Sequence, residues 1–363
     1  MRFPFFSYYC YYYSVVGLIY VLLFFQIPAF PARKISAPVR VLTADAYNAT
    51  WGNFEKFIDV GKGSRVSGMS ELKQYFHRFG YLSPMKAASF DDVFDDSFQS
   101  AVMKYQENLG LPVTGKLDSV TIKQIVTPRC GVSDSIASGA GRWFHITKHF
   151  AYFYGHPRWV KSKPITLTYA FAEDHLIDYL SLDEIKAVFR RAFSRWEAVI
   201  PMNFTEVEHR VADVRIGFFR GDHGDGEPFD GVLGALAHAF SPENGRLHLD
   251  AAETWAVDFK SQKSSVAVDL ESVATHEIGH VLGLAHSSVK EAIMYPSLSP
   301  RTKKVDLRID DVVGVQALYG SNPNFKLSSL LESDSTSNQP VDSRTGSCRW
   351  AVLTATIFLI LWS

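Results

Sequence analysis

The residues best suited to chemistry lie between His276 and His286. This segment opens with His-Glu-Ile-Gly-His, so that His276 and His280 are four residues apart and Glu277 follows the first. On a helix, positions i and i+4 share one face, and both imidazoles can reach a single metal. Neutral imidazole nitrogen suits zinc, and a glutamate that is not a ligand can act on water as general base. The spacing predicts a hydrolytic zinc site.

The pattern continues beyond the second histidine. Gly283 and His286 complete H-E-x-x-H-x-x-G-x-x-H, and Met294 follows eight residues later. The helix must stop for His286 to return to the metal, and glycine accepts the left-handed conformation that such a stop needs. A bare H-E-x-x-H often occurs in helices by chance, whereas the extended motif followed by a methionine turn is far more specific.

The N-terminus carries a targeting signal. After Met1-Arg2, the run from Val15 to Ile27 has no charge, and prolines and small residues follow it. This predicts a secretory signal peptide over residues 1–32. A retained signal anchor is the alternative, because aromatic residues before the run lengthen the apolar segment.

The C-terminus carries a second signal. Trp350 to Trp362 is almost wholly apolar, and upstream lie a polar spacer and a cluster of small residues at 333–337. This arrangement predicts a glycosylphosphatidylinositol (GPI) signal, with a linker at 321–335, attachment at Ser335 and removal of residues 336–363. A plain tail anchor is the alternative, but the run is short for a membrane span of about 20 residues.

The cysteines support a processed, secreted chain. The chain has three cysteines. Cys10 lies in the predicted signal peptide and Cys348 in the predicted C-terminal signal, so that the processed chain would keep only Cys130. An unpaired thiol is unusual in a secreted protein and calls for a role. Two glycosylation sequons, at Asn48 and Asn203, suit the same compartment.

Two domains must position these residues. The first, at 51–126, is predicted to be helical, since apolar residues recur at helical spacing from Phe98 to Leu109 and helices are expected at 70–79 and 117–125. A connector at 131–149 leads to the second domain, 150–320. There, alternation predicts strands at 165–171 and 214–218, and a capping box at Ser181 opens a helix. Two further helices are expected, one holding His276 and one at 310–319. The stretch 221–255 is expected to be rich in loops.

On these motifs the chain resembles the matrix metalloproteinases of the metzincin group, in a plant-type form without a haemopexin domain. The resemblance runs from the helical domain to about Gly320 and is strongest at residues 276–287, 128–134 and 220–240. It implies an α+β fold: a metzincin catalytic domain with a twisted mixed sheet, helices and a zinc cleft, after a small three-helix pro-domain. It also implies a zinc metalloendopeptidase that acts on extracellular proteins or peptides.

The resemblance gives the lone thiol a role. Pro-Arg-Cys-Gly-Val-Ser-Asp at 128–134 resembles the family's cysteine switch. In this switch Cys130, which lies in the implied propeptide (33–149), would be a fourth zinc ligand and keep the precursor silent. Arg129 and Asp134 would hold the loop. The family usually has proline where this chain has Ser133. An activating protease is implied, with cleavage expected just before Phe150.

The resemblance also implies structural metals. A second zinc would be held by His223, Asp225, His238 and His248. A calcium ion would be held by the carboxylates and carbonyls of Asp230, Gly231, Leu233, Ala235, Asp250 and Glu253. A further calcium would use Asp213. In the family, the new terminal ammonium pairs with an aspartate of the last helix, here Asp310 or Asp311, although both could simply cap that helix.

The resemblance implies a substrate site beside the metal. An extended substrate would pair with residues 233–237, and residues 296–298 would border the main specificity pocket. The formal net charge of −1 argues against nucleic acid as a binding partner. We expect a monomer at the outer face of the plasma membrane or in the extracellular matrix, attached through its lipid anchor. The rival hypothesis is a non-catalytic wall-binding or adhesion protein, motivated by the helical domain; a rival within the enzymes is another metzincin family.

Overall fold

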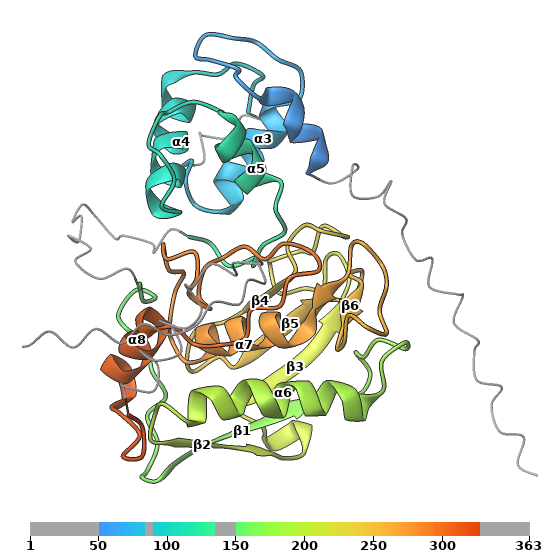
Figure 1. The fold of residues 1–363 in the computed structure, drawn as a ribbon, viewed down its shortest axis with the longest axis vertical. Coiled ribbons are helices and arrows are strands. Elements are labelled where there is room, and N and C mark those ends of the chain that lie inside the picture. The colour runs from blue at the N-terminus through green and yellow to red at the C-terminus, as the bar shows by residue number, and fades with distance from the viewer. Residues whose placement is uncertain (1–50, 84–89, 135–149, 327–363) are drawn as a thin grey trace, which may run out of the picture. The chain divides into compact units, whose positions relative to one another are not determined.

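The structure, a computed structural model, describes residues 51–83, 90–134 and 150–326 (Figure 1). The predicted signal peptide, Asn48, Ser335 and the C-terminal signal lie outside these ranges. Within the described residues, no helix is both long and apolar enough to cross a membrane.

The first domain is a small helical unit. It contains a 3-10 helix, η1 (Gly52–Phe57), and the helices α3 (Met69–Arg78), α4 (Asp96–Asn108) and α5 (Ser119–Ile125). Asp95 and Asp118 cap α4 and α5 by accepting bonds from backbone amides, as N-cap carboxylates commonly do. Its core is mainly aromatic, with Phe76 in ring contact with both Phe98 and Tyr105. The predicted three-helix pro-domain is confirmed.

The second domain is built on a mixed sheet with strand order β2-β1-β3-β5-β4. Its strands are β1 (Ile165–Phe171), β2 (Met202–Glu206), β3 (Val214–Phe219), β4 (Ala237–Ala239) and β5 (Arg246–Asp250). Only β4 runs antiparallel to its neighbour. A separate pair is formed by β6 (Trp255–Ala256) and β7 (Val268–Asp269). Asn203 is exposed on β2, an edge strand, and so remains accessible to glycosylation.

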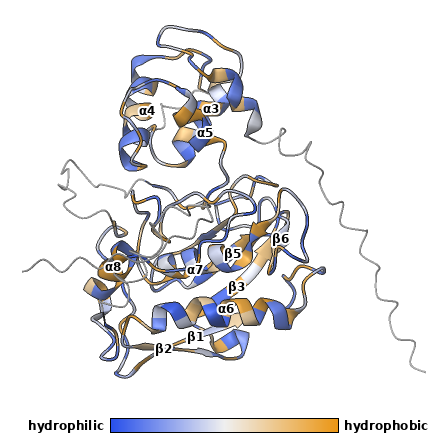
Figure 2. Cartoon of the chain, viewed as in Figure 1, coloured by the Kyte–Doolittle hydropathy of each residue, from blue (hydrophilic) through white to orange (hydrophobic). Residues whose placement is uncertain are grey.

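Helices complete this domain. The helix α6 (Leu182–Glu197) begins with the predicted capping box, in which Ser181 and Glu184 bond reciprocally. Apolar and polar residues are interspersed along its length (Figure 2). It packs on α7 (Leu270–Val281), which is buried throughout. The last helix, α8 (Ile309–Tyr319), ends at Gly320. The predicted α+β fold is confirmed; β4 and β5 lie in a stretch where we expected mainly loops.

Candidate metal centre

The helix α7 carries His276, Glu277 and His280 on buried positions. Gly283 follows with φ of 105°, and a Cβ there would lie 2.3 Å from the carbonyl oxygen of Pro157. Only glycine combines this conformation with so close a backbone approach. The chain can therefore turn back after α7 and return His286 to the other two histidines.

Four potential ligands converge on one point. Each of His276, His280, His286 and Cys130 offers a ligand atom within 4.8 Å of all the others. The sulfur of Cys130 lies 3.4 Å from His280 Nε2, which lies 3.2 Å from His286 Nε2. Three imidazoles and one thiol are a tetrahedral donor set that suits zinc.

The outer nitrogens of the three histidines are already engaged. The Nδ1 atoms of His276 and His280 lie 2.7 and 2.8 Å from the carbonyl oxygens of Ile293 and Leu284, to which they can donate. This tautomer leaves each Nε2 with a lone pair facing the centre, as in many zinc sites. His276 Nε2 is buried and has no hydrogen-bond partner in the described parts of the chain. Burial also lowers the pKa of His276 and of His280 well below the usual value, so both are neutral. These atoms fit a cation.

Glu277 lies beside the converging ligands. Its carboxylate oxygens are buried without a hydrogen-bond partner among the described residues. Burial raises its pKa to about 8, an effect that the neighbouring Cys130 thiol opposes. A carboxyl group whose pKa is near neutrality suits proton transfer in both directions.

The methionine turn lies directly beneath α7. A Cβ on Gly279 would be 2.2 Å from the sulfur of Met294. The Asp311 carboxylate accepts from the backbone amides of Ile293 and Met294, at 2.9 and 3.0 Å, and thereby fixes the turn. We had expected Asp310 or Asp311 to serve the new N-terminus; Asp311 is fully buried in this other role, and Asp310 accepts from Ser287. Sequence reasoning missed the contact between Asp311 and the methionine turn.

The segment around Cys130 lies in the cleft as a strand between two walls. On one side, the amide of Arg129 donates to Gly234 O at 3.1 Å, and that of Leu236 to Arg129 O at 2.8 Å. On the other, the amide of Cys130 donates to Pro296 O at 2.8 Å. The pairing of Arg129 with Ala235 is parallel. Residues 233–237 thus offer backbone pairing, although the regular strand β4 begins only at Ala237.

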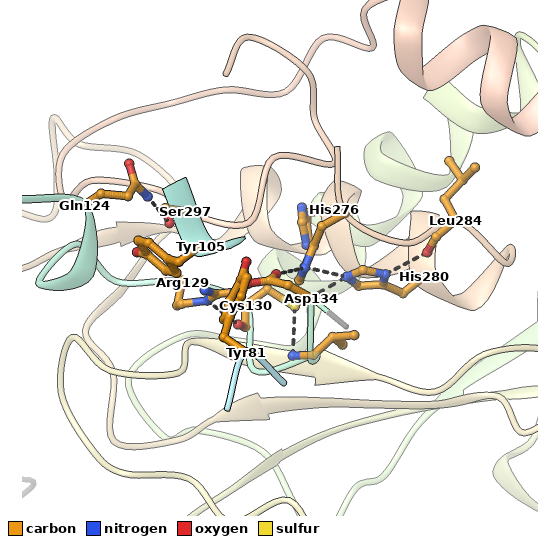
Figure 3. Close-up of polar contacts among 12 residues, drawn as sticks. Tyr81, Tyr105, Gln124, Arg129, Cys130, Asp134, His276, His280, Leu284 and Ser297 are labelled. Carbon is orange, nitrogen blue, oxygen red and sulfur yellow. Dashed lines mark hydrogen bonds and ion pairs between the residues drawn. The ribbon is translucent and has the colours of Figure 1, made fainter. Parts of the chain in front are cut away.

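Arg129 and Asp134 hold this segment in place (Figure 3). Their side chains form a buried ion pair of 2.5 Å, and the guanidinium lies 3.8 Å from the ring centre of Phe79. Asp134 also accepts from the Tyr81 hydroxyl at 2.6 Å and from His286 Nδ1 at 2.6 Å. Although burial opposes it, the charge of Arg129 and the hydrogen bond from His286 hold the pKa of Asp134 well below its usual range.

A second ligand cluster lies at β4 and β5. These strands pair His238 with His248, and Asp225 Oδ2 lies 2.8 Å from a ring nitrogen of each and 2.9 Å from His223 Nε2. Burial lowers the pKa of both His238 and His248 to about 4. Neutral imidazoles around one carboxylate oxygen, without an open position, fit a structural zinc ion.

Three acidic residues that we expected to bind calcium lie near one another: Asp250 and Glu253 are buried, whereas Asp230 is partly exposed and pairs with Arg78 at 3.0 Å. Burial raises the pKa of Asp250 to about 6 and that of Glu253 well above its usual value, and nearby Asp230 contributes to both shifts. Glu253 Oε2 is buried without a partner, although Oε1 accepts from the Leu233 amide. Such crowded carboxylates fit a hard cation. Gly231, whose carbonyl was also expected to be a ligand, has a positive φ of 96° and donates its amide to Asp250.

Asp213 does not join this group. Its carboxylate accepts from the Lys161 ammonium at 2.5 Å and from the amide and hydroxyl of Thr168. Asp213 is thus already paired with a cation of the chain itself, and its expected role at a second calcium ion stays a prediction.

A cavity opens beside the first centre. It is bordered by Cys130, His276 and Glu277, and by the segment from Ile293 to Leu298. The expected border at residues 296–298 is therefore part of its wall. Its depth and the groups at its far end were not readable from the sequence.

Comparisons with known proteins agree with this site. A family model for matrixin matches residues 158–320, and one for a peptidoglycan binding domain matches residues 65–125. The chain is 58% identical to metalloendoproteinase 1-MMP of Arabidopsis thaliana over 82% of this chain and 81% of that protein. It is 46% identical to metalloendoproteinase 1 of Glycine max, over 74% and 87% respectively.

These findings place the chain in a family. It belongs to the matrixins, zinc metalloendopeptidases that act on proteins and use catalytic and structural zinc together with calcium. The resemblance to the plant matrix metalloproteinases is thereby confirmed, and the enzyme is favoured over the adhesion hypothesis.

Proposed function

We propose that this protein is a latent, secreted zinc endopeptidase that stays inactive while Cys130 lies among its zinc ligands. The observation that carries the proposal is the position of the Cys130 sulfur, 3.4 Å from His280 Nε2 and within the ligand set of His276, His280 and His286. A thiolate there completes four-coordination and leaves no position for water.

The pro-segment also blocks the substrate site. Residues 128–131 use the backbone groups of residues 234–237 and of 296–298 that an extended substrate would need. Their chain direction is parallel to residues 233–237, which explains how the segment can fill the cleft as a non-productive ligand. The proposed activation is cleavage by another protease near Phe150, followed by loss of residues 33–149.

In the activated enzyme, His276, His280 and His286 would hold zinc, which supplies Lewis acidity toward the scissile carbonyl and toward water. Glu277 would take the proton from the attacking water and pass it to the leaving amine. Its position next to His276 on α7, buried beside the ligands, would bring the carboxylate close to both the attacking water and the leaving amine. Met294 and Asp311 would keep the floor of the site rigid.

The experiment uses the full-length, zinc-loaded precursor with a quenched peptide. Cys130→Ser should cleave the peptide without prior processing, whereas the intact precursor should not. The double variant Cys130→Ser/Glu277→Ala should keep zinc and lose turnover. Continued silence of Cys130→Ser would contradict latency through the thiol, and full turnover of the double variant would contradict the role of Glu277.

We further propose that residues 1–32 are a signal peptide and that a lipid at Ser335 holds the enzyme on the outer face of the plasma membrane. The sequence patterns at both termini support this. Phosphatidylinositol-specific phospholipase should release the enzyme from cells, and a Ser335→Leu variant should reach the medium or be retained inside. Full retention on the surface after treatment would argue for a protein anchor.

A further inference from the structure

A lysine contributes to the wall of the cavity beside the metal centre. Its walls are largely apolar, from Leu236, Val273, Ile293 and Leu298, but Lys304 also lines it. The Lys304 amide donates to Ser272 Oγ at 2.7 Å, and Ser272 lies one helical turn before His276 on α7. The four residues from Ser272 to His276 rise about 6 Å along the helix. Lys304 is therefore a wall residue of this cavity, bonded to α7 one turn before the ligand His276.

The ammonium of Lys304 has no carboxylate partner. It donates to the carbonyl oxygens of Ala292 at 2.8 Å and Lys290 at 3.4 Å, and lies 5.4 Å from the ring centre of Tyr295. Within the described residues, no acidic oxygen lies within the 4 Å ion-pair distance of it. A lysine has three donors, so these two carbonyl bonds leave one donor for a further acceptor.

The neighbouring lysine shows the contrast. The Lys303 ammonium pairs with Glu271 at 3.0 Å and with Asp269 at 3.6 Å. Lys304 is instead partly withdrawn from water, and burial lowers its pKa to about 8 even though Asp311 and Glu291 act in the opposite direction. A cation that is poorly hydrated and lacks a counter-ion attracts an anionic ligand more strongly than a surface lysine does.

We propose that Lys304 is a specificity-determining residue, which selects substrates with glutamate directly after the scissile bond over substrates with an apolar residue of equal length. The proposal rests on the proposed function, because the side chain of that residue enters the cavity only if the substrate occupies the cleft now filled by residues 128–131. Its carboxylate would accept a charge-assisted hydrogen bond from the Lys304 ammonium. The apolar walls would contact its methylene groups.

The test uses the zinc-loaded enzyme after removal of its propeptide, with two peptides that differ only in having glutamate or methionine after the scissile bond. The ratio of kcat/KM for the glutamate and methionine peptides should fall about tenfold in Lys304→Met. Lys303→Met, the matched control, should keep the wild-type ratio. Lys304→Arg, which retains the charge, should keep most of the preference.

Two results would overturn the proposal. One is an unchanged ratio in Lys304→Met while the methionine peptide is still cleaved; the other is an equal fall in Lys303→Met. If Lys304→Met does not fold, Lys304→Gln serves in its place with the same expectation. A wild-type protein that cleaves neither peptide would instead count against the proposed function.

Discussion

Asp134 Oδ1 lies 2.6 Å from Nδ1 of His286, so a residue of the pro-segment is hydrogen bonded to a candidate zinc ligand of the catalytic domain. His276 and His280 are oriented by backbone carbonyls of their own domain. Only the third histidine takes its partner from the segment that activation would remove, among the residues the structure describes. If the precursor is latent as proposed, we expect this latency to depend on Asp134 as well as on Cys130.

We therefore expect Asp134→Ala to weaken latency while Cys130 is still present. The substitution removes the partners of both Arg129 and His286, and each such charge-assisted bond contributes about 1.5–3 kcal/mol. The full-length, unprocessed precursor should cleave the quenched peptide at least tenfold faster than wild type at matched concentration. Tyr81→Phe, which removes only the hydroxyl bonded to Asp134 Oδ2, is the control and should have a smaller effect. Equal rates for Asp134→Ala and wild type would contradict this prediction.

Gly279→Ala should destabilise the catalytic domain. The added methyl group would lie 2.2 Å from Met294 Sδ and 3.1 Å from a ring carbon of Trp196, so the turn below the metal would have to move. Overpacking of this kind costs about 1–3 kcal/mol. Chemical denaturation would detect the loss of stability, and peptide turnover would detect the movement of the turn below the metal. Gly61→Ala, where the new Cβ meets nothing within 4 Å, should leave both unchanged.

Glu271 should make the fold sensitive to acid. Its buried carboxylate is bonded by Arg191, Arg195 and Lys303. Although burial opposes the shift, these cations lower its pKa from 4.5 to about 2. The pKa of Glu271 is lower in the folded protein than in the unfolded chain. The ion pairs therefore stabilise the fold fully at any pH above the unfolded-state pKa, and this stabilisation is lost as the pH falls from about 4.5 to 2.

The measurement is urea denaturation of wild type and Glu271→Gln between pH 7 and pH 3. At pH 7 the variant should be less stable by about 1–2 kcal/mol, a value reduced for the partial exposure of the three cations. The difference should shrink toward pH 3. Glu173→Gln, at an exposed position, should match wild type throughout. A difference that stays constant with pH would refute the assignment.

Asp225 should link stability to bound metal. If it holds a structural zinc ion with His223, His238 and His248, then Asp225→Ala should lower the melting temperature by about 5–10 °C in zinc-replete buffer. After exhaustive chelation, wild type and variant should melt at similar temperatures, since the contribution of the ion is then gone. Asp222→Ala, in the same loop but outside the cluster, is the control. If the melting temperature of Asp225→Ala stays equally far below that of wild type after the metal is removed, Asp225 acts through its hydrogen bonds alone.

Much of the site was predictable because its parts are local. The spacing of His276, Glu277 and His280 needs only one helical turn, and the capping box at Ser181 is complete within four residues. Apolar residues at helical spacing likewise predicted α4, and the helices expected at 70–79 and 117–125 correspond to α3 and α5. These features depend on backbone geometry that neighbouring residues determine.

Other features depend on residues far apart in the chain. The sequence by itself determined that a zinc motif, a lone thiol and a histidine-rich loop are present, since residue types and short spacings define them. Only the tertiary structure decided that Asp134 bonds His286, that Asp311 holds the methionine turn and that Lys304 lines the cavity, where no carboxylate of the described residues pairs with it. The physical reason is that burial and long-range packing, which set these contacts and their charges, arise only when separate elements meet.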